Sequence, residues 1–102
     1  MKKSFFMLLT LLAVSDVSFA YCHSEYVGGL DPYGDNFLSV RSGPSSRYRR
    51  IDTLHTGDKV GVCEYRGSWK RIYYGTNGSC SIRNGEIIGR CYSGWAYGKY
   101  LR

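Results

Sequence analysis

The segment FLSVRSGPSSRYRRIDTLHTGDKVGV, residues 37–62, carries the strongest structural signals in this chain. Apolar and polar residues alternate at its beginning and again near its end, where Val60 and Val62 are two residues apart. Alternation with a period of two is typical of a strand that buries one face. Between these parts, Pro44 fixes its own φ angle and keeps Gly43 out of the α-helical region. The segment therefore predicts short strands separated by tight turns.

The same succession of short strands and turns covers the rest of the chain, and no window of ten or more residues has helical periodicity. In CSIRNGEIIGRC, residues 80–91, Asn84-Gly85 is the dipeptide preferred in type I′ hairpins, which sets Ile82 opposite Ile87. Short strands with this spacing predict an all-β barrel or sandwich, and the length favours a small barrel. We expect the other strands at residues 24–29, 37–41, 50–54, 59–65 and 69–74, and a last one within residues 93–102.

The first 20 residues, MKKSFFMLLTLLAVSDVSFA, have the three-part pattern of a secretory signal peptide. Two lysines precede an apolar stretch, and small residues stand at positions 18 and 20. A membrane anchor is the alternative, but the apolar stretch is shorter than the ~20 residues that span a bilayer, and Asp16 interrupts it. We therefore predict cleavage after Ala20. The mature chain, residues 21–102, would be one exported domain without a transmembrane segment, in the periplasm or outside the cell.

The mature chain has 82 residues with 12 basic and 7 acidic side chains, after the leader's two lysines and one aspartate are removed. Its four cysteines predict two disulfides, since an even count is typical of short exported proteins. Three pairings are possible. We favour Cys80–Cys91, which encloses the predicted hairpin, together with Cys22–Cys63. A two-residue turn pairs Cys80 with Gly89, so a bond to Cys91 requires a bulge or a looser end. Each disulfide would contribute ~2–4 kcal/mol to a marginal core.

The ordered blocks FLSVRSGPSSRYRRIDTL, TGDKVGV, GSWKRI and GWAYGKYL resemble the bacterial SH3 domain family over residues 37–101. The resemblance implies an SH3-like barrel of about five to seven short strands, with Leu38 and Val40 in its core. Ser39 stands where the family usually has asparagine, and Ala96 where it usually has valine. About a dozen additional residues separate the last two blocks. They contain the cysteine-flanked hairpin, residues 80–91, which we interpret as an insertion.

The resemblance also implies a peptide groove lined by aromatic side chains at strand ends and loops. Tyrosine and tryptophan are frequent in binding hot spots because they offer large, stiff and partly polar surfaces. Basic residues nearby could bind an anionic partner. The alternatives are that the two tryptophans only cap the barrel and that the arginines only increase solubility. The candidate ligand-binding residues are Tyr48, Trp69, Tyr73, Trp95, Tyr100, Arg47 and Arg49.

The chain shows no motif for catalysis, metal binding or a cofactor, and we predict none of these. His23 and His55 are the only histidines, and neither has a nucleophile and carboxylate arranged beside it in the sequence. The resemblance implies a non-catalytic module that binds a cell-wall peptide or a protein segment. Export argues against nucleic acid. Two alternatives stay open: an inhibitor or immunity protein that blocks an enzyme through the hairpin, and a small enzyme dependent on a histidine. The ligand and the oligomeric state are not determined by the sequence.

Overall fold

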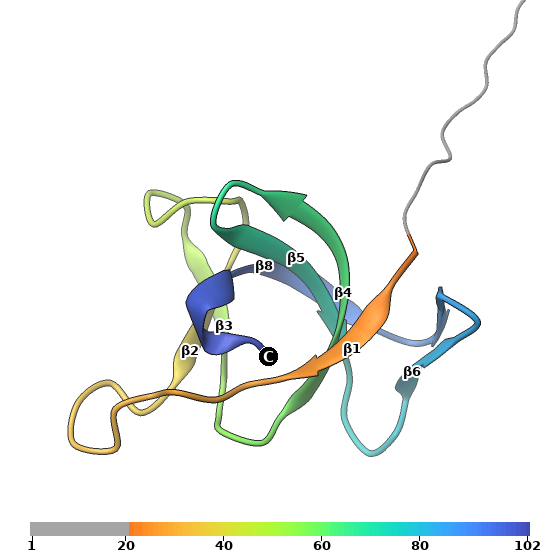
Figure 1. The fold of residues 1–102 in the computed structure, drawn as a ribbon, viewed down its shortest axis with the longest axis horizontal. Helices are drawn as coiled ribbons and strands as arrows, with labels where there is room; N and C mark the ends of the chain where they lie inside the picture. The colour runs from red at the N-terminus through yellow and green to blue at the C-terminus, as the bar shows by residue number, and fades with distance from the viewer. Residues whose placement is uncertain (1–20) are drawn as a thin grey trace, which may run out of the picture.

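The computed structural model describes residues 21–102, so the predicted leader, residues 1–20, lies outside the described residues. The described part is built from strands and one 3-10 helix, which confirms the all-β prediction (Figure 1). No helix in residues 21–102 is long and apolar enough to cross a membrane. The elements are β1 (His23–Tyr26), β2 (Leu38–Arg41), β3 (Arg50–Leu54), β4 (Lys59–Arg66), β5 (Trp69–Tyr74), β6 (Cys80–Arg83), β7 (Glu86–Gly89), β8 (Tyr92–Tyr97) and η2 (Gly98–Tyr100).

Six strands form one curled antiparallel sheet in the order β1-β4-β5-β8-β2-β3, and β6 and β7 form a separate hairpin. Within residues 21–102 no ladder joins the edge strands β1 and β3, so the sheet is open and the expectation of a closed barrel is not met. The first strand also ends earlier than predicted. Val27 instead forms an isolated bridge with Leu101, and its N–H group donates a hydrogen bond to the Asp58 carbonyl.

The core lies on the concave face of the sheet and follows the alternation seen in the sequence. Val40, Val60, Val62 and Ile72 are fully buried, and they come from three strands, β2, β4 and β5. Leu38 is also buried, as the family resemblance implied. Burying an aliphatic side chain of this size contributes roughly 1.5–3 kcal/mol. Apolar burial on one face therefore orients the opposite, convex face toward solvent.

The SGPS turn after β2 is fixed by two contacts. A Cβ atom on Gly43 would collide with the ring of Tyr48, so the close approach of this ring requires glycine. Arg41 Nη1 also donates a hydrogen bond of 3.0 Å to the Tyr48 carbonyl. These contacts fold the loop of residues 42–49 back beside β2.

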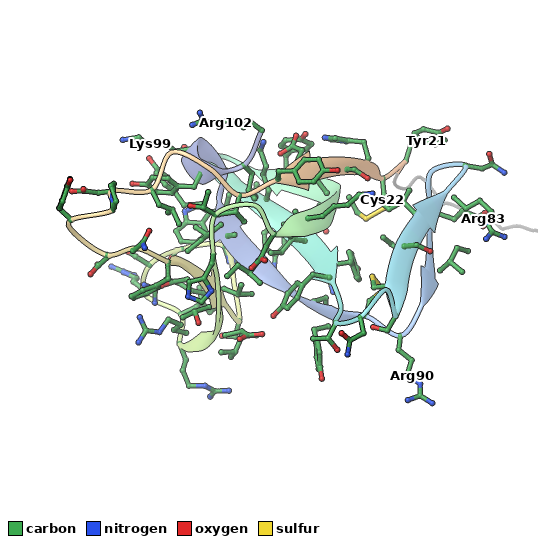
Figure 2. The ribbon with its side chains drawn as sticks, turned by 90° about the horizontal axis from the view of Figure 1, so that it is seen from below. Tyr21, Cys22, Arg83, Arg90, Lys99 and Arg102 are labelled. Carbon is green, nitrogen blue, oxygen red and sulfur yellow. A yellow bond between two sulfur atoms is a disulfide. The ribbon has the colours of Figure 1, made fainter. Side chains whose placement is uncertain are left out.

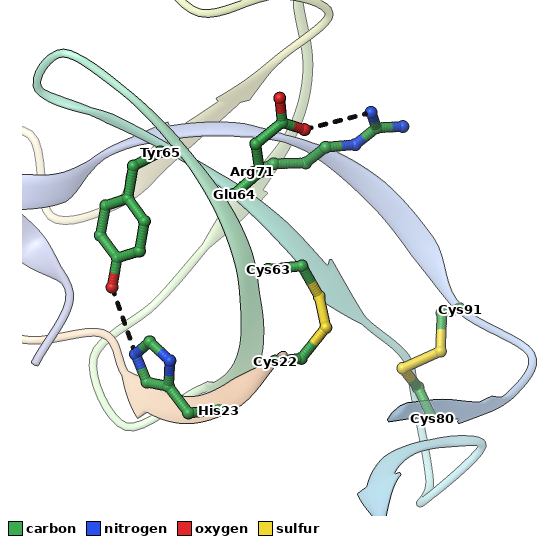
Figure 3. The surroundings of a disulfide bond; sticks show 8 residues. All are labelled: Cys22, His23, Cys63, Glu64, Tyr65, Arg71, Cys80 and Cys91. Atoms are coloured by element: carbon green, nitrogen blue, oxygen red, sulfur yellow. Dashed lines mark hydrogen bonds and ion pairs between the residues drawn. A yellow bond between two sulfur atoms is a disulfide. The ribbon is translucent and has the colours of Figure 1, made fainter. Parts of the chain in front are cut away.

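The two disulfides are Cys22–Cys63 and Cys80–Cys91, which is the pairing favoured from the sequence (Figure 3). Cys80 faces Gly89 in the β6–β7 ladder, as a two-residue turn requires. The chain leaves this register at Gly89, whose φ angle is +94°. The Arg90 N–H group then donates to the Ser79 carbonyl at 2.9 Å, and this irregular end lets Cys91 return to Cys80.

The hairpin is attached to the large sheet at two further points. Ile82 and Ile87 face each other and lie over Gly61 of β4, where a Cβ atom would be 2.8 Å from Ile82 Cδ1. At the hairpin tip, the Gly85 carbonyl accepts a hydrogen bond of 2.9 Å from the Cys22 N–H group. Figure 2 shows the hairpin, with Arg83 and Arg90, at the opposite end of the molecule from Lys99.

Candidate functional site

The convex face of β5 and β8 carries three of the predicted site residues. Residues directly paired across antiparallel strands share a face of the sheet. Trp69 pairs with Tyr97, Arg71 with Trp95, and Tyr73 with Ser93. Because the intervening residue Ile72 lies in the core, these pairs point outward.

A groove of about 640 Å³ opens at one end of this convex face. Trp69 and Tyr97 meet with their ring centroids 5.6 Å apart, and Tyr97 and Tyr100 meet at 6.0 Å. Tyr100 belongs to η2, so the helix places it beside the end of β8. The aromatic part of the lining is completed by Phe37, which immediately precedes β2. The remaining lining residues are Leu30, Asp31, Asp35, Leu38, Ser39, Arg41, Ser45 and Ser46.

The groove contains charges of both signs. Asp31 and Asp35 lie in the loop before β2, and Arg41 lies at the end of β2. Asp31 Oδ1 accepts a hydrogen bond of 2.9 Å from the Tyr33 N–H group, which fixes the turn that carries this carboxylate. The groove can therefore combine aromatic stacking with hydrogen bonds to polar or charged groups of a ligand.

Trp95 does not line the groove, because it is covered by arginine side chains. Its exposed fraction is only 8%. The guanidinium of Arg66 lies 5.6 Å from the centroid of its ring, and that of Arg71 lies 6.0 Å away. Such cation–π contacts stabilise guanidinium groups over an indole face. Trp95 therefore supports a basic surface next to the groove. It is covered, as the capping hypothesis expects, and it also lies beside the predicted binding surface.

The structure brings together only part of the predicted set. Trp69 and Tyr100 share the groove, whereas Tyr73 lies farther along β5, with the Arg71 guanidinium 5.7 Å from its ring centroid. The ring of Tyr48 covers Gly43 and is not part of the lining. The other predicted residues outside the lining are Arg47 and Arg49, which are exposed on the loop after β2.

Only Trp69 and Tyr100 of the twelve lining residues were in the predicted set, and the ten that were missed include Phe37, Tyr97 and Arg41. Tyr97 is two residues after Trp95 on the same strand, so the period of two places both on one face and could have identified it. Arg41 likewise follows the buried Val40 and must point outward. Phe37 lies just before β2, but the predicted strand of residues 37–41 includes it, so its alternation with the buried Leu38 could also have placed it outward.

A second polar cluster lies where β1 meets β4 and β5. The Glu25 carboxylate has two close partners: Oε2 lies 2.7 Å from His23 Nε2, and Oε1 lies 2.8 Å from Lys70 Nζ. Burial alone would raise the pKa of Glu25, but the hydrogen bonds from Lys70 and His23, with the charges of both partners, lower the pKa below its usual value. The Tyr65 hydroxyl lies 3.4 Å from His23 Nε2 (Figure 3). This cluster ties the first strand to the sheet.

Among residues 21–102, no three histidine, cysteine, aspartate or glutamate side chains are grouped so that they could hold a metal ion. His55, the second histidine, lies in the turn before β4, where its backbone N–H group donates to Asp58 Oδ2 at 2.8 Å. Comparisons with models of protein families, with curated proteins and with solved structures found no match to this chain.

Proposed function

We propose that the protein is an exported, non-catalytic binding module of the bacterial SH3 type, and that its aromatic groove binds an extended peptide of the cell wall or of a partner protein. The observation that carries this proposal is the gathering of Phe37, Trp69, Tyr97 and Tyr100 around one groove. These residues come from separate parts of the chain, and none of them is fully buried in the core.

The chemistry of the groove suits a peptide better than a small apolar molecule. Flat aromatic surfaces bind extended backbones and apolar side chains, and they leave polar rims for hydrogen bonds. Asp31 and Asp35 can accept hydrogen bonds from ligand amines or amides, and Ser39 adds a hydroxyl to the lining. The order of sequence blocks that resembles bacterial SH3 domains supports the same function. The two disulfides are typical of exported proteins.

Insoluble peptidoglycan provides a direct test. The oxidised protein should sediment with it at low salt, and Trp69→Ala should weaken the retention by about 2 kcal/mol or more, as expected for an aromatic hot spot. The matched control is Tyr26→Ala, which removes an exposed aromatic ring outside the groove and should bind like the wild type. Equal retention of both variants, or no retention of the wild type, would contradict wall binding through this groove.

A second candidate function is inhibition of an enzyme through the β6–β7 hairpin. The hairpin is held by its own disulfide, forms a two-stranded sheet of its own and exposes Ile88 and Arg83. An inhibitor of this kind should form a tight one-to-one complex in extracts of the native cell envelope. Shortening residues 81–90 should abolish that complex, and an undiminished complex would exclude the hairpin as the inhibitory element.

A further inference from the structure

The convex face carries one continuous row of side chains across five strands. The directly paired residues are Glu64 with Arg71, Arg71 with Trp95, Trp95 with Arg41, and Arg41 with Arg50. Register shifts lie beside two of these pairs, between Val40 and Arg41 and between Val62 and Glu64. Contacts show that Glu64, Arg71 and Trp95 lie together on one side of the sheet, because the Arg71 guanidinium lies near both the Trp95 ring and the Glu64 carboxylate. Three of the five paired residues are arginines. Arg41 also lines the groove, so the row and the groove are contiguous.

Glu64 is the only acidic residue of this row, and two arginines hold it. Arg66 Nη2 lies 3.2 Å from Glu64 Oε2, and Arg71 Nη1 lies 3.7 Å from Glu64 Oε1 (Figure 3 shows the Arg71 contact). The two guanidinium groups therefore converge on one carboxylate while they lie over the ring of Trp95. Carboxylates are the planar anions that match the fork of donors on arginine.

The bonding of Arg71 is incomplete. Its Nε atom is buried and has no hydrogen-bond partner among the described residues. A buried donor without an acceptor costs free energy. Its distance to Glu64 is also at the long end of the range for an ion pair. Glu64 thus neutralises one of the two charges of Arg66 and Arg71 and leaves the Arg71 Nε donor without a partner among the described residues.

We propose that the guanidinium groups of Arg66 and Arg71, supported by the Trp95 ring, form a carboxylate-binding site that Glu64 occupies in the free protein. A peptide carboxylate displaces Glu64 and takes its place between the two guanidinium groups. This inference rests on the proposed function, since it names the group that the surface beside the groove recognises: a free carboxylate on the bound peptide.

The two tryptophans of the chain allow this site to be observed by itself. In a Trp69→Phe background, the fluorescence of Trp95 alone reports on the guanidinium groups above it. The probe is N-acetylglutamate, titrated into the high-millimolar range at constant ionic strength, with uncharged N-acetylglutamine amide as the matched compound. We expect a saturable change with the dicarboxylate and none with the amide.

Variants of the row give the decisive comparison. Glu64→Gln should strengthen N-acetylglutamate binding roughly two- to five-fold, because it removes an exposed competing ion pair. Arg71→Gln should weaken binding by about ten-fold or more, the effect of losing a hydrogen bond to a charged group. Arg47→Gln, an exposed arginine outside the groove lining and the row, should change it little. Circular dichroism of each variant verifies that it is folded.

Unchanged or weaker binding in Glu64→Gln would overturn the displacement of Glu64. Equal binding of Arg71→Gln and Arg47→Gln would overturn the site itself, and tighter binding of inorganic phosphate than of the dicarboxylate would overturn the choice of ligand. Every sample of this series carries Trp69→Phe in the groove, and the probe is a small dicarboxylate rather than a wall fragment. This titration therefore tests the carboxylate site separately from the binding of peptidoglycan by the groove.

Discussion

Different bonds hold the groove and the hairpin in place. The groove takes Tyr100 from η2, and Figures 1 and 2 show η2 and the hairpin at opposite ends of the described residues. At the groove end, loops and η2 are fixed by core packing and hydrogen bonds such as the one from Arg41 to the Tyr48 carbonyl. At the hairpin end, the Cys80–Cys91 disulfide closes the hairpin. The Cys22–Cys63 disulfide lies close to the hairpin tip, where the Cys22 N–H group donates a hydrogen bond to the Gly85 carbonyl.

The difference has a physical reason. A two-stranded hairpin buries little apolar surface and is marginal by itself in water, so it depends on covalent bonds and a few contacts. The groove end is part of a six-stranded sheet with a continuous core, so its convex face can leave aromatic rings uncovered. The comparison indicates that stability is concentrated in covalent bonds at one end while the other end keeps its surface free for a ligand.

The largest expected effect is the loss of free energy of unfolding when either disulfide is removed. Replacing Cys22 and Cys63 by alanine should lower the free energy of unfolding by about 4 kcal/mol, and replacing Cys80 and Cys91 by about 3 kcal/mol. The order follows from the sequence separations of 41 and 11 residues, since longer closed loops restrict the unfolded chain more. Urea unfolding followed by circular dichroism measures both values. A larger loss from the hairpin disulfide would reverse the expected order.

A smaller test concerns the contact between hairpin and sheet. Gly61→Ala should cost about 1–3 kcal/mol through overpacking, because the new Cβ atom would lie 2.8 Å from Ile82 Cδ1 and 3.0 Å from Ile87 Cδ1. Hydrogen exchange should show faster opening of β6 and β7 and no change around the groove. The control is Gly28→Ala, whose Cβ would meet only Arg102 atoms at 3.8 Å. Similar costs for the two variants would show that the hairpin does not depend on this contact.

The smallest expected effect is a pH dependence at the hairpin-side end of β5. Burial, followed by the hydrogen bond and the charge of Asp52, raises the pKa of Tyr74 well above 10.0. The folded protein thus favours the neutral phenol, so this contribution is complete below pH 10 and is lost as the pH rises further. Tyr74→Phe removes the 2.7 Å hydrogen bond to Asp52 and should cost about 1 kcal/mol at neutral pH.

Denaturant unfolding between neutral pH and pH 11 measures this effect. The wild type should lose more stability above pH 10 than Tyr74→Phe, so that the two curves approach each other. Tyr26→Phe, at an exposed tyrosine, serves as the control and should follow the wild type. Parallel curves for wild type and Tyr74→Phe would contradict the raised pKa of Tyr74.

Sequence reasoning predicted the strands well where apolar residues alternate. β3 and β5 have the predicted bounds, and Ile82 faces Ile87 across the Asn84-Gly85 turn. It predicted the site less well. Trp69 and Tyr100 lie in the groove, but Trp95 is covered, because its neighbours Arg66 and Arg71 come from other strands. Local periodicity gives the face on which a side chain lies, but not what a partner strand places over it.

The sequence by itself determined the all-β class and the turn residues, because these follow from short-range backbone preferences. It favoured one of three disulfide pairings, which the structure confirms. Only the tertiary structure decided that β8 lies between β5 and β2. That long-range order brings Trp69 and Tyr97 together and aligns Arg71, Trp95 and Arg41 in one row. The physical reason is that the register between distant strands depends on the packing of the whole core, and no short segment of the chain contains that information.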